Sequence, residues 1–236
     1  MYFEKTQYII FHLMKNNIHP CGRFFSVVLL VAFSLIQGQV SAQTTLLSAS
    51  GDGGFENGPS FAANGWTVVN GSGVTNKWFV GTVPTLFPGS NSAYVSDDAA
   101  GATHNFNNAA GSIVHFYRDV TLPAGETNLT YGYQWYAQGE STYDFVQISV
   151  GSTSIVPVAA SGVAGSISPI SLPLIPGTTV IGAHNLQGAV QTVTSTVSSA
   201  AFGNCFAPAT IRIFFTWRND GSGGTQPPVA LDNIFL

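Results

Sequence analysis

A strict period-two alternation near the end of the chain most constrains its fold. The apolar set of this alternation consists of Ile211, Ile213, Phe215 and Trp217, and the intervening set of Arg212, Phe214, Thr216 and Arg218. A β-strand with two different faces has this period, because successive side chains point to opposite sides. After a turn rich in Gly and Pro, the apolar residues 229–234 carry one carboxylate, Asp232. An isolated buried charge is unfavourable, so Asp232 requires a partner or a role.

The same alternation recurs in short segments along the chain. Within residues 113–121, Val114, Phe116 and Val120 share one face. Further strands are expected at residues 65–69, 77–80, 92–96, 129–136, 144–150, 178–181, 190–196 and 229–234. No amphipathic helix, heptad or internal repeat is apparent. About 10–12 short strands in one domain predict an all-β fold, an antiparallel β-sandwich of the jelly-roll, concanavalin-like kind.

One long segment, residues 145–211, contains no charged residue and is rich in Ser, Thr, Gly, Ala and Val. Such a segment is either a disordered linker or a set of strands joined by long loops. The alternations at residues 178–181 and 190–196 favour strands.

The first 42 residues have the pattern of a secretory signal peptide, with Met1 or Met14 as the start. Basic Lys15 and Arg23 precede an apolar run at residues 24–36, and Val-Ser-Ala ends at position 42. The alternative is a membrane anchor, but the run is shorter than the roughly 18 residues that a spanning helix requires. We therefore expect a cleaved signal, a secreted or cell-surface protein with no membrane span after cleavage, and a single domain at residues 43–236.

The expected mature chain is acidic. Its only Lys or Arg residues are Lys77, Arg118, Arg212 and Arg218, against ten Asp or Glu. This balance argues against nucleic acid or an anionic membrane surface as a partner, since both require a basic face. The expected mature chain also has a single cysteine, Cys205, so no intrachain disulfide is expected after cleavage. Its apolar surroundings favour a buried thiol over a reactive thiol or an interchain disulfide.

Two short motifs resemble a known group of extracellular β-sandwiches. Gly54-Phe55-Glu56 with Trp66 near the start, and Leu231-Asp232-Asn233-Ile234 at the end, are similar to bacterial cleaved-adhesin (gingipain adhesin-like) modules. MAM domains and several carbohydrate-binding modules share this layout. A MAM domain carries several disulfide cysteines, so the cysteine-poor bacterial modules fit better.

The resemblance implies that the first and last strands lie side by side and share a structural calcium ion. Carried over by motif, Glu56 and Asp232 are its ligands, with Asp52 as a further candidate, and a hard cation suits such oxygen ligands. Alternatively, Glu56 caps a turn and Asp232 accepts backbone hydrogen bonds. Asp97 and Asp98 are candidates for a second metal site, or else a solvated strand end.

The aromatic residues outnumber what one core face holds, so some rings are candidates for stacking on a sugar. Tyr117 and Tyr136 lie on the more polar strand faces and are the best candidates. Nearby Arg118, Gln134 or Arg212 would hydrogen-bond the sugar hydroxyls.

These observations predict a secreted, non-catalytic module that binds a glycan or a surface protein. The alternatives are a structural or interaction domain of a larger surface protein without glycan binding, and an accessory domain of a glycoside hydrolase. An enzyme is disfavoured, because Glu56, Glu126 and Glu140 are scattered rather than clustered as glycoside hydrolysis requires. His104, His115 and His184 likewise lack a protease or metal-ligand context.

Overall fold

The computed structural model describes residues 43–126, 128–198 and 209–236. Residues from Thr45 to Leu236 form one compact unit. The described residues contain no α-helix and no helix that is long and apolar enough to cross a membrane. They form eleven strands: β1 (Thr67–Val69), β2 (Lys77–Gly81), β3 (Ser92–Ser96), β4 (Ser112–Leu122), β5 (Asn128–Ala137), β6 (Phe145–Ser152), β7 (Ala160–Ser161), β8 (Thr179–His184), β9 (Gln187–Ser198), β10 (Ala209–Asn219) and β11 (Ala230–Phe235). Two short 3-10 turns are η1 (Asp52–Gly54) and η2 (Ala62–Asn64).

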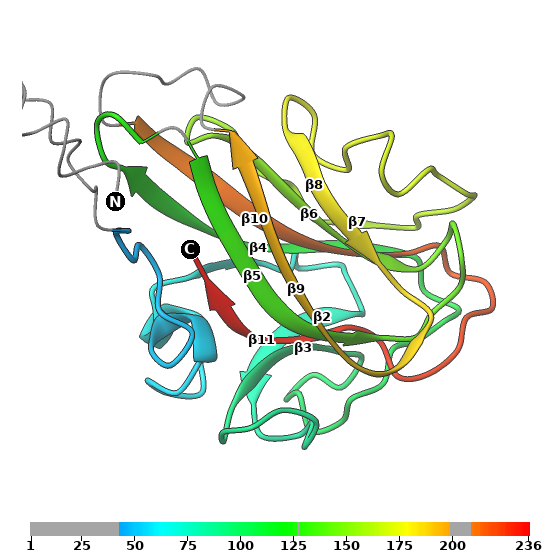
Figure 1. Cartoon of the computed structure of the whole chain (residues 1–236). Coiled ribbons are helices and arrows are strands. Elements are labelled where there is room, and N and C mark those ends of the chain that lie inside the picture. The colour runs from blue at the N-terminus through cyan, green and yellow to red at the C-terminus, as the bar shows by residue number, and fades with distance from the viewer. Residues whose placement is uncertain (1–42, 127, 199–208) are drawn as a thin grey trace, which may run out of the picture. The chain divides into compact units, whose positions relative to one another are not determined.

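The strands make two antiparallel sheets (Figure 1). Sheet A has the order β1-β4-β10-β6-β8, with β7 beside β4, and sheet B has the order β2-β3-β11-β5-β9. The chain crosses between the sheets repeatedly, for example from β4 to β5 and from β10 to β11. The predicted all-β antiparallel sandwich is therefore confirmed, and the two-residue β7 is the one strand here without a counterpart among the expected segments.

Aromatic side chains from both sheets fill the core. Phe116 of β4 and Phe215 of β10 stack with ring centroids 4.9 Å apart and an interplanar angle of 7°. Tyr133 of β5 meets Phe215 edge-on at 5.8 Å. All four tryptophans are buried here: Trp66, Trp78, Trp135 and Trp217. Rings at these distances add to the stability that their burial provides. Because all four tryptophans lie in the core, few large rings remain for the surface.

The outer face of sheet A is largely covered by the chain itself. Residues 153–178, which we call the strap, connect β6 to β8 and include β7, which pairs with β4. Four outward side chains from β4, β6 and β10 hold the strap by hydrogen bonds to its backbone: His115, Gln147, Arg212 and Arg218. Both faces of β10 are consequently buried over most of its length. The alternation does define two faces of β10, but its polar face is covered.

The start of the compact unit pairs with the end of the chain. Leu46 N donates to Leu236 O (2.8 Å), and Leu236 N donates to Leu47 O (3.1 Å). The η1 turn packs on β11, since a Cβ at Gly53 would lie only 1.7 Å from Ile234 O. The first strand, β1, belongs to sheet A and the last, β11, to sheet B, so the expected side-by-side placement of the first and last strands is wrong. Residues 46–47 and η1 lie beside the end of the chain instead.

Candidate functional site

A polar surface lies where β4 and β10 run side by side on the outer face of sheet A. The antiparallel register places Asp119 opposite Arg212, Tyr117 opposite Phe214, and Thr121 opposite Thr210. Side chains directly opposite on one face of a sheet are close enough to interact. The register therefore brings a carboxylate, a guanidinium, a phenol ring and two hydroxyls together.

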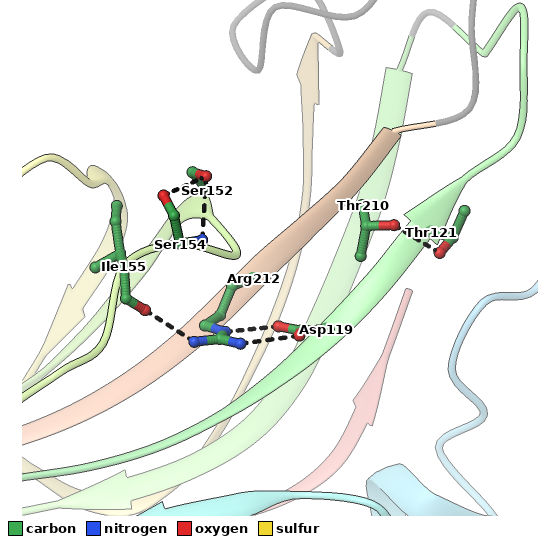
Figure 2. Close-up of polar contacts among 7 residues, drawn as sticks. All are labelled: Asp119, Thr121, Ser152, Ser154, Ile155, Thr210 and Arg212. Carbon is green, nitrogen blue, oxygen red and sulfur yellow. Dashed lines mark hydrogen bonds and ion pairs between the residues drawn. The ribbon is translucent and has the colours of Figure 1, made fainter.

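Asp119 and Arg212 form a two-pronged ion pair at the centre of this surface (Figure 2). Arg212 Nε donates to Asp119 Oδ1 (2.6 Å) and Nη2 donates to Oδ2 (2.9 Å). Arg212 Nη1 donates to Ile155 O of the strap (2.8 Å), and its guanidinium lies over the Tyr117 ring at 4.1 Å. The hydrogen bond that Arg212 donates to Asp119 raises the pKa of Arg212. The Arg212 side chain is 11% exposed and that of Asp119 is 41% exposed, so the carboxylate faces solvent in a fixed orientation.

Hydroxyl groups flank this ion pair on both sides (Figure 2). The Thr121 and Thr210 hydroxyls are 3.0 Å apart, and those of Ser152 and Ser154 are 2.9 Å apart. A shallow pocket of about 290 Å³ adjoins them; it is lined by Val150, Gly151, Ser152, Gly177, Thr179, Ala209, Thr210 and Ile211. Oriented charges and hydroxyls beside a pocket are suited to a ligand with many hydroxyl groups.

Of the five predicted ligand-binding residues, Tyr117 and Arg212 lie together at the surface just described and the other three do not. Tyr117 is half-buried at the surface just described. Arg118 is directed to the N-terminal turns instead, where Nη1 pairs with Asp52 Oδ2 (2.7 Å) and donates to Asn64 O (3.0 Å). The Arg118 guanidinium therefore stabilises the contact between β4 and the N-terminal turns.

The other two predicted ligand residues belong to β5 of sheet B. Gln134 Oε1 accepts a hydrogen bond from Asn233 Nδ2 (2.8 Å). Tyr136 is only 9% exposed and has the His104 ring at 6.4 Å, so it does not offer an open face for stacking. The polar character of its strand face suggested exposure, but residues before β4 cover that face.

Asp119 was missed as a site residue. The sequence does carry a signal for this pair: Asp119 and Arg212 have opposite charges and lie on the polar faces of two predicted strands. The signal is incomplete without the strand register, which the sequence does not specify.

The buried carboxylate of Asp232 is the second unusual group. Asp232 is 1% exposed, and its Oδ1 and Oδ2 accept hydrogen bonds from Asn233 N (2.7 Å) and Asn233 Nδ2 (3.3 Å). Burial raises its pKa to about 7; the Asn233 N–H opposes this rise and the charge of Glu56 adds to it. Glu56 in turn accepts from Ser90 N (2.7 Å) and Asn91 N (3.0 Å) through Oε1.

This environment fits a bound cation. The two ion pairs of the described residues are Arg118–Asp52 and Arg212–Asp119, so no basic side chain neutralises Asp232. Within the same ranges no three His, Cys, Asp or Glu side chains converge on a common metal position. A cation between Glu56 and Asp232 would therefore need backbone or water oxygens as well, which is ordinary for Ca²⁺. The hydrogen bonds that Glu56 and Asp232 accept are also those expected in the alternative, in which Glu56 caps a turn and Asp232 accepts backbone hydrogen bonds.

The other acidic candidates have partners of their own. Asp52 binds Arg118 and also accepts from Asn57 Nδ2 (2.7 Å). Asp98 Oδ1 accepts from Ala100 N and Ala102 N, both at 2.9 Å, and these bonds lower its pKa. Asp97 is exposed, and its Oδ1 accepts a weak hydrogen bond from Thr103 (3.4 Å).

The three histidines of the described domain lie in separate environments. His104 is near Val229 O, His115 contacts Thr216, and His184 Nε2 lies 2.7 Å from the Tyr133 hydroxyl. Burial lowers the pKa of each to about 4. They form no common centre. The expectations for Cys205 and for the signal peptide fall outside the described residues.

No protein-family model matches the chain, and no curated protein matches it. Solved structures do. The K1 cleaved adhesin domain of Lys-gingipain from Porphyromonas gingivalis has 16% identity and a TM-score of 0.43, with 82% of this chain and 97% of that chain covered. TmCBM61 in complex with beta-1,4-galactotriose has 15% identity and a TM-score of 0.42, with the same two coverages. The enzymatically active domain of bacteriophage CBA120 tailspike protein 4 has 14% identity and a TM-score of 0.40; the match covers 80% of this chain but only 21% of that one. Cleaved-adhesin and carbohydrate-binding domains, which the sequence motifs resemble, are thus both among the similar structures.

Proposed function

We propose that this chain is a secreted, non-catalytic binding module that recognises a glycan through the outer face of sheet A. The proposed site consists of Asp119, Arg212, Thr121 and Thr210 with the adjoining pocket. A calcium ion between Glu56 and Asp232 stabilises the module without taking part in recognition.

The observation that carries this proposal is the exposed, fixed carboxylate of Asp119. Adjacent sugar hydroxyls donate and accept hydrogen bonds, and a charged partner makes such bonds about twice as strong as neutral ones. Arg212 holds the carboxylate with two bonds of 2.6 and 2.9 Å and is itself held by the strap and by Tyr117. Little conformational entropy therefore remains to be lost when a ligand binds, which favours affinity.

Calcium at the other position would act on the fold. Glu56 follows η1 and Asp232 lies in β11, so a shared ion would join the start of the domain to its last strand. The raised pKa of Asp232 supports this role, because a carboxylate that is unfavourable when charged and unpaired gains most from a cation.

The test compares the mature wild type with Asp119→Asn on glycan arrays and in affinity gels containing soluble polysaccharides. Asp119→Asn keeps the shape of the side chain but removes its charge, so retention should weaken about tenfold to a hundredfold on the best polysaccharide. Glu126→Gln removes the same charge elsewhere and serves as the matched control. Equal retention of Asp119→Asn and wild type, or no retention of the wild type by any glycan, would refute the proposed site.

A second candidate is an interaction domain that binds a surface protein and no glycan. The strap favours it, because this uncharged segment exposes Val156 (72%), Val158 (78%) and Ile170 (70%). Exposed apolar residues grouped on one segment are typical of protein interaction sites. Attachment to cells by a wild type that no glycan retains would favour this candidate over the first.

A further inference from the structure

Two loops meet at one end of the sandwich and are firmly joined. Gly139 N donates to Thr225 O (2.8 Å), and Thr225 N donates to Gly139 O (3.1 Å). Asn185, which lies between β8 and β9, also holds the first of these loops, because its Nδ2 donates to the backbone oxygens of Glu140 (3.0 Å) and Asp144 (2.9 Å). The loop between β5 and β6 and the loop after β10 therefore hold each other in fixed positions.

Asp144 is buried between these loops with half of its carboxylate unused. The residue is 1% exposed, and Oδ1 accepts from Asp220 N at 3.2 Å. Its other oxygen, Oδ2, is buried and has no hydrogen-bond partner among the described residues. A buried carboxylate oxygen without a partner is strongly unfavourable unless something else satisfies it.

The surroundings of Asp144 are negative. Burial raises its pKa to about 7, and the nearby charges of Asp220 and Glu140 act in the same direction. The Asp220 N–H and the charge of Arg218 oppose this rise without reversing it. Arg218 makes no ion pair within the described ranges; it donates instead to the backbone oxygens of Tyr143 and of the strap. Negative charge in excess of the one guanidinium thus remains at this end of the domain.

Two consecutive glycines allow one turn to approach the carboxylates closely. A Cβ on Gly224 would lie 2.2 Å from Asp144 Oδ2, and a Cβ on Gly223 would lie 2.9 Å from Glu140 Oε2. The oxygens of Asp144 and Glu140 therefore face neighbouring residues of one turn. Asp220 is turned elsewhere, since both of its carboxylate oxygens accept from the Ser222 hydroxyl (3.2 and 3.1 Å).

We propose that Asp144 Oδ2 and Glu140 bind a hard divalent cation, best matched by Ca²⁺, beside the Gly223–Gly224 turn. Both side chains that would bind the ion are carboxylates. Glu140 is half-exposed, which leaves space for water ligands. Ca²⁺ accepts such mixed oxygen shells and tolerates irregular geometry, whereas Mg²⁺ requires a near-ideal octahedron and Zn²⁺ favours nitrogen and sulfur. Both ligands belong to the loop between β5 and β6, and the site is independent of Glu56 and Asp232.

The test counts bound ions in the folded, signal-free protein by calorimetry with Ca²⁺ and by sensitised luminescence of Tb³⁺. Asp144→Asn should lose one equivalent of bound cation, and Glu140→Gln should weaken that equivalent about tenfold or more. Asp232→Asn should leave this equivalent intact, and Glu126→Gln should change nothing. If the Glu56–Asp232 proposal fails, Asp232→Asn binds as many cations as the wild type, while Asp144→Asn still loses one. The two proposals are therefore tested separately.

Unchanged stoichiometry and affinity in Glu140→Gln together with Asp144→Asn would overturn this inference. Glu140→Gln carries the test if Asp144→Asn does not fold, since Glu140 is half-exposed and its backbone makes the loop contacts. A wild type that binds no Ca²⁺ or Tb³⁺ would also overturn it.

Discussion

Replacing Asp232 by asparagine should stabilise the metal-free protein above neutral pH. The pKa of Asp232 rises from 3.8 in an unperturbed chain to about 7 in the fold. The native state therefore holds this proton more tightly than the unfolded chain, and stability falls as pH rises from about 4 to about 7. A shift of about three units corresponds to about 4 kcal/mol, the largest penalty expected for ionised Asp232 above that window.

Asparagine carries no such penalty because it does not ionise. In EDTA at pH 8, Asp232→Asn should exceed the wild type in free energy of unfolding by up to about 4 kcal/mol, less the cost of any hydrogen bond that Asn233 loses. At pH 4 the two proteins should differ little. Urea unfolding followed by tryptophan fluorescence measures both quantities, with Glu126→Gln as the charge-matched control.

Calcium should narrow this difference in the free energy of unfolding. An ion that binds only the folded state adds about 2.7 kcal/mol at one hundred times its dissociation constant. Asp232→Asn should lose the part of this gain that comes from the Glu56–Asp232 position. The reasoning would be refuted by an Asp232→Asn protein that is less stable than wild type in EDTA at pH 8, or that shows the full calcium gain.

Two further predictions concern the ends of the chain. Gly53→Ala would place a Cβ 1.7 Å from Ile234 O, so it should destabilise the fold by about 2 kcal/mol or more, measured by thermal melting; Gly73→Ala, with nothing within 4 Å, is the control and should leave the melting temperature nearly unchanged. Mass spectrometry of the protein exported by a bacterial secretion host should show a chain that starts near Gln43, and an uncleaved exported chain would contradict the signal peptide.

Much of the fold could be predicted because the strands carry strong local signals. The alternation around Phe116 and Phe215 specifies both strands and their inward faces, and the two residues do stack in the core. The covered outer face of β10 could not be predicted in this way. It depends on how the strap crosses the sheet, and the strap contains no charge or alternation that would indicate its path.

The candidate sites were harder to predict from the sequence, because they too depend on contacts between distant residues. Asp232 is unusual within its own strand, so its importance is visible locally. Asp144 is adjacent to an ordinary strand, and its unusual state arises only when Gly224 and Asp220, about eighty residues away, close over it. Likewise, the Asp119–Arg212 pair exists only in one strand register. Local sequence patterns do not contain such distant juxtapositions.

The position of β11 has a consequence for how the domain is made. This strand is synthesised after the other ten described strands, yet it lies between β3 and β5 in the middle of sheet B. Until residues 230–235 have left the ribosome, β3 and β5 have no neighbour to join them, and the inward face of that sheet is open. Sheet B can therefore close only after β11 has been synthesised. Such long-range pairing is slow, so the unfinished domain depends on its few charges and on any holding factors to avoid aggregation.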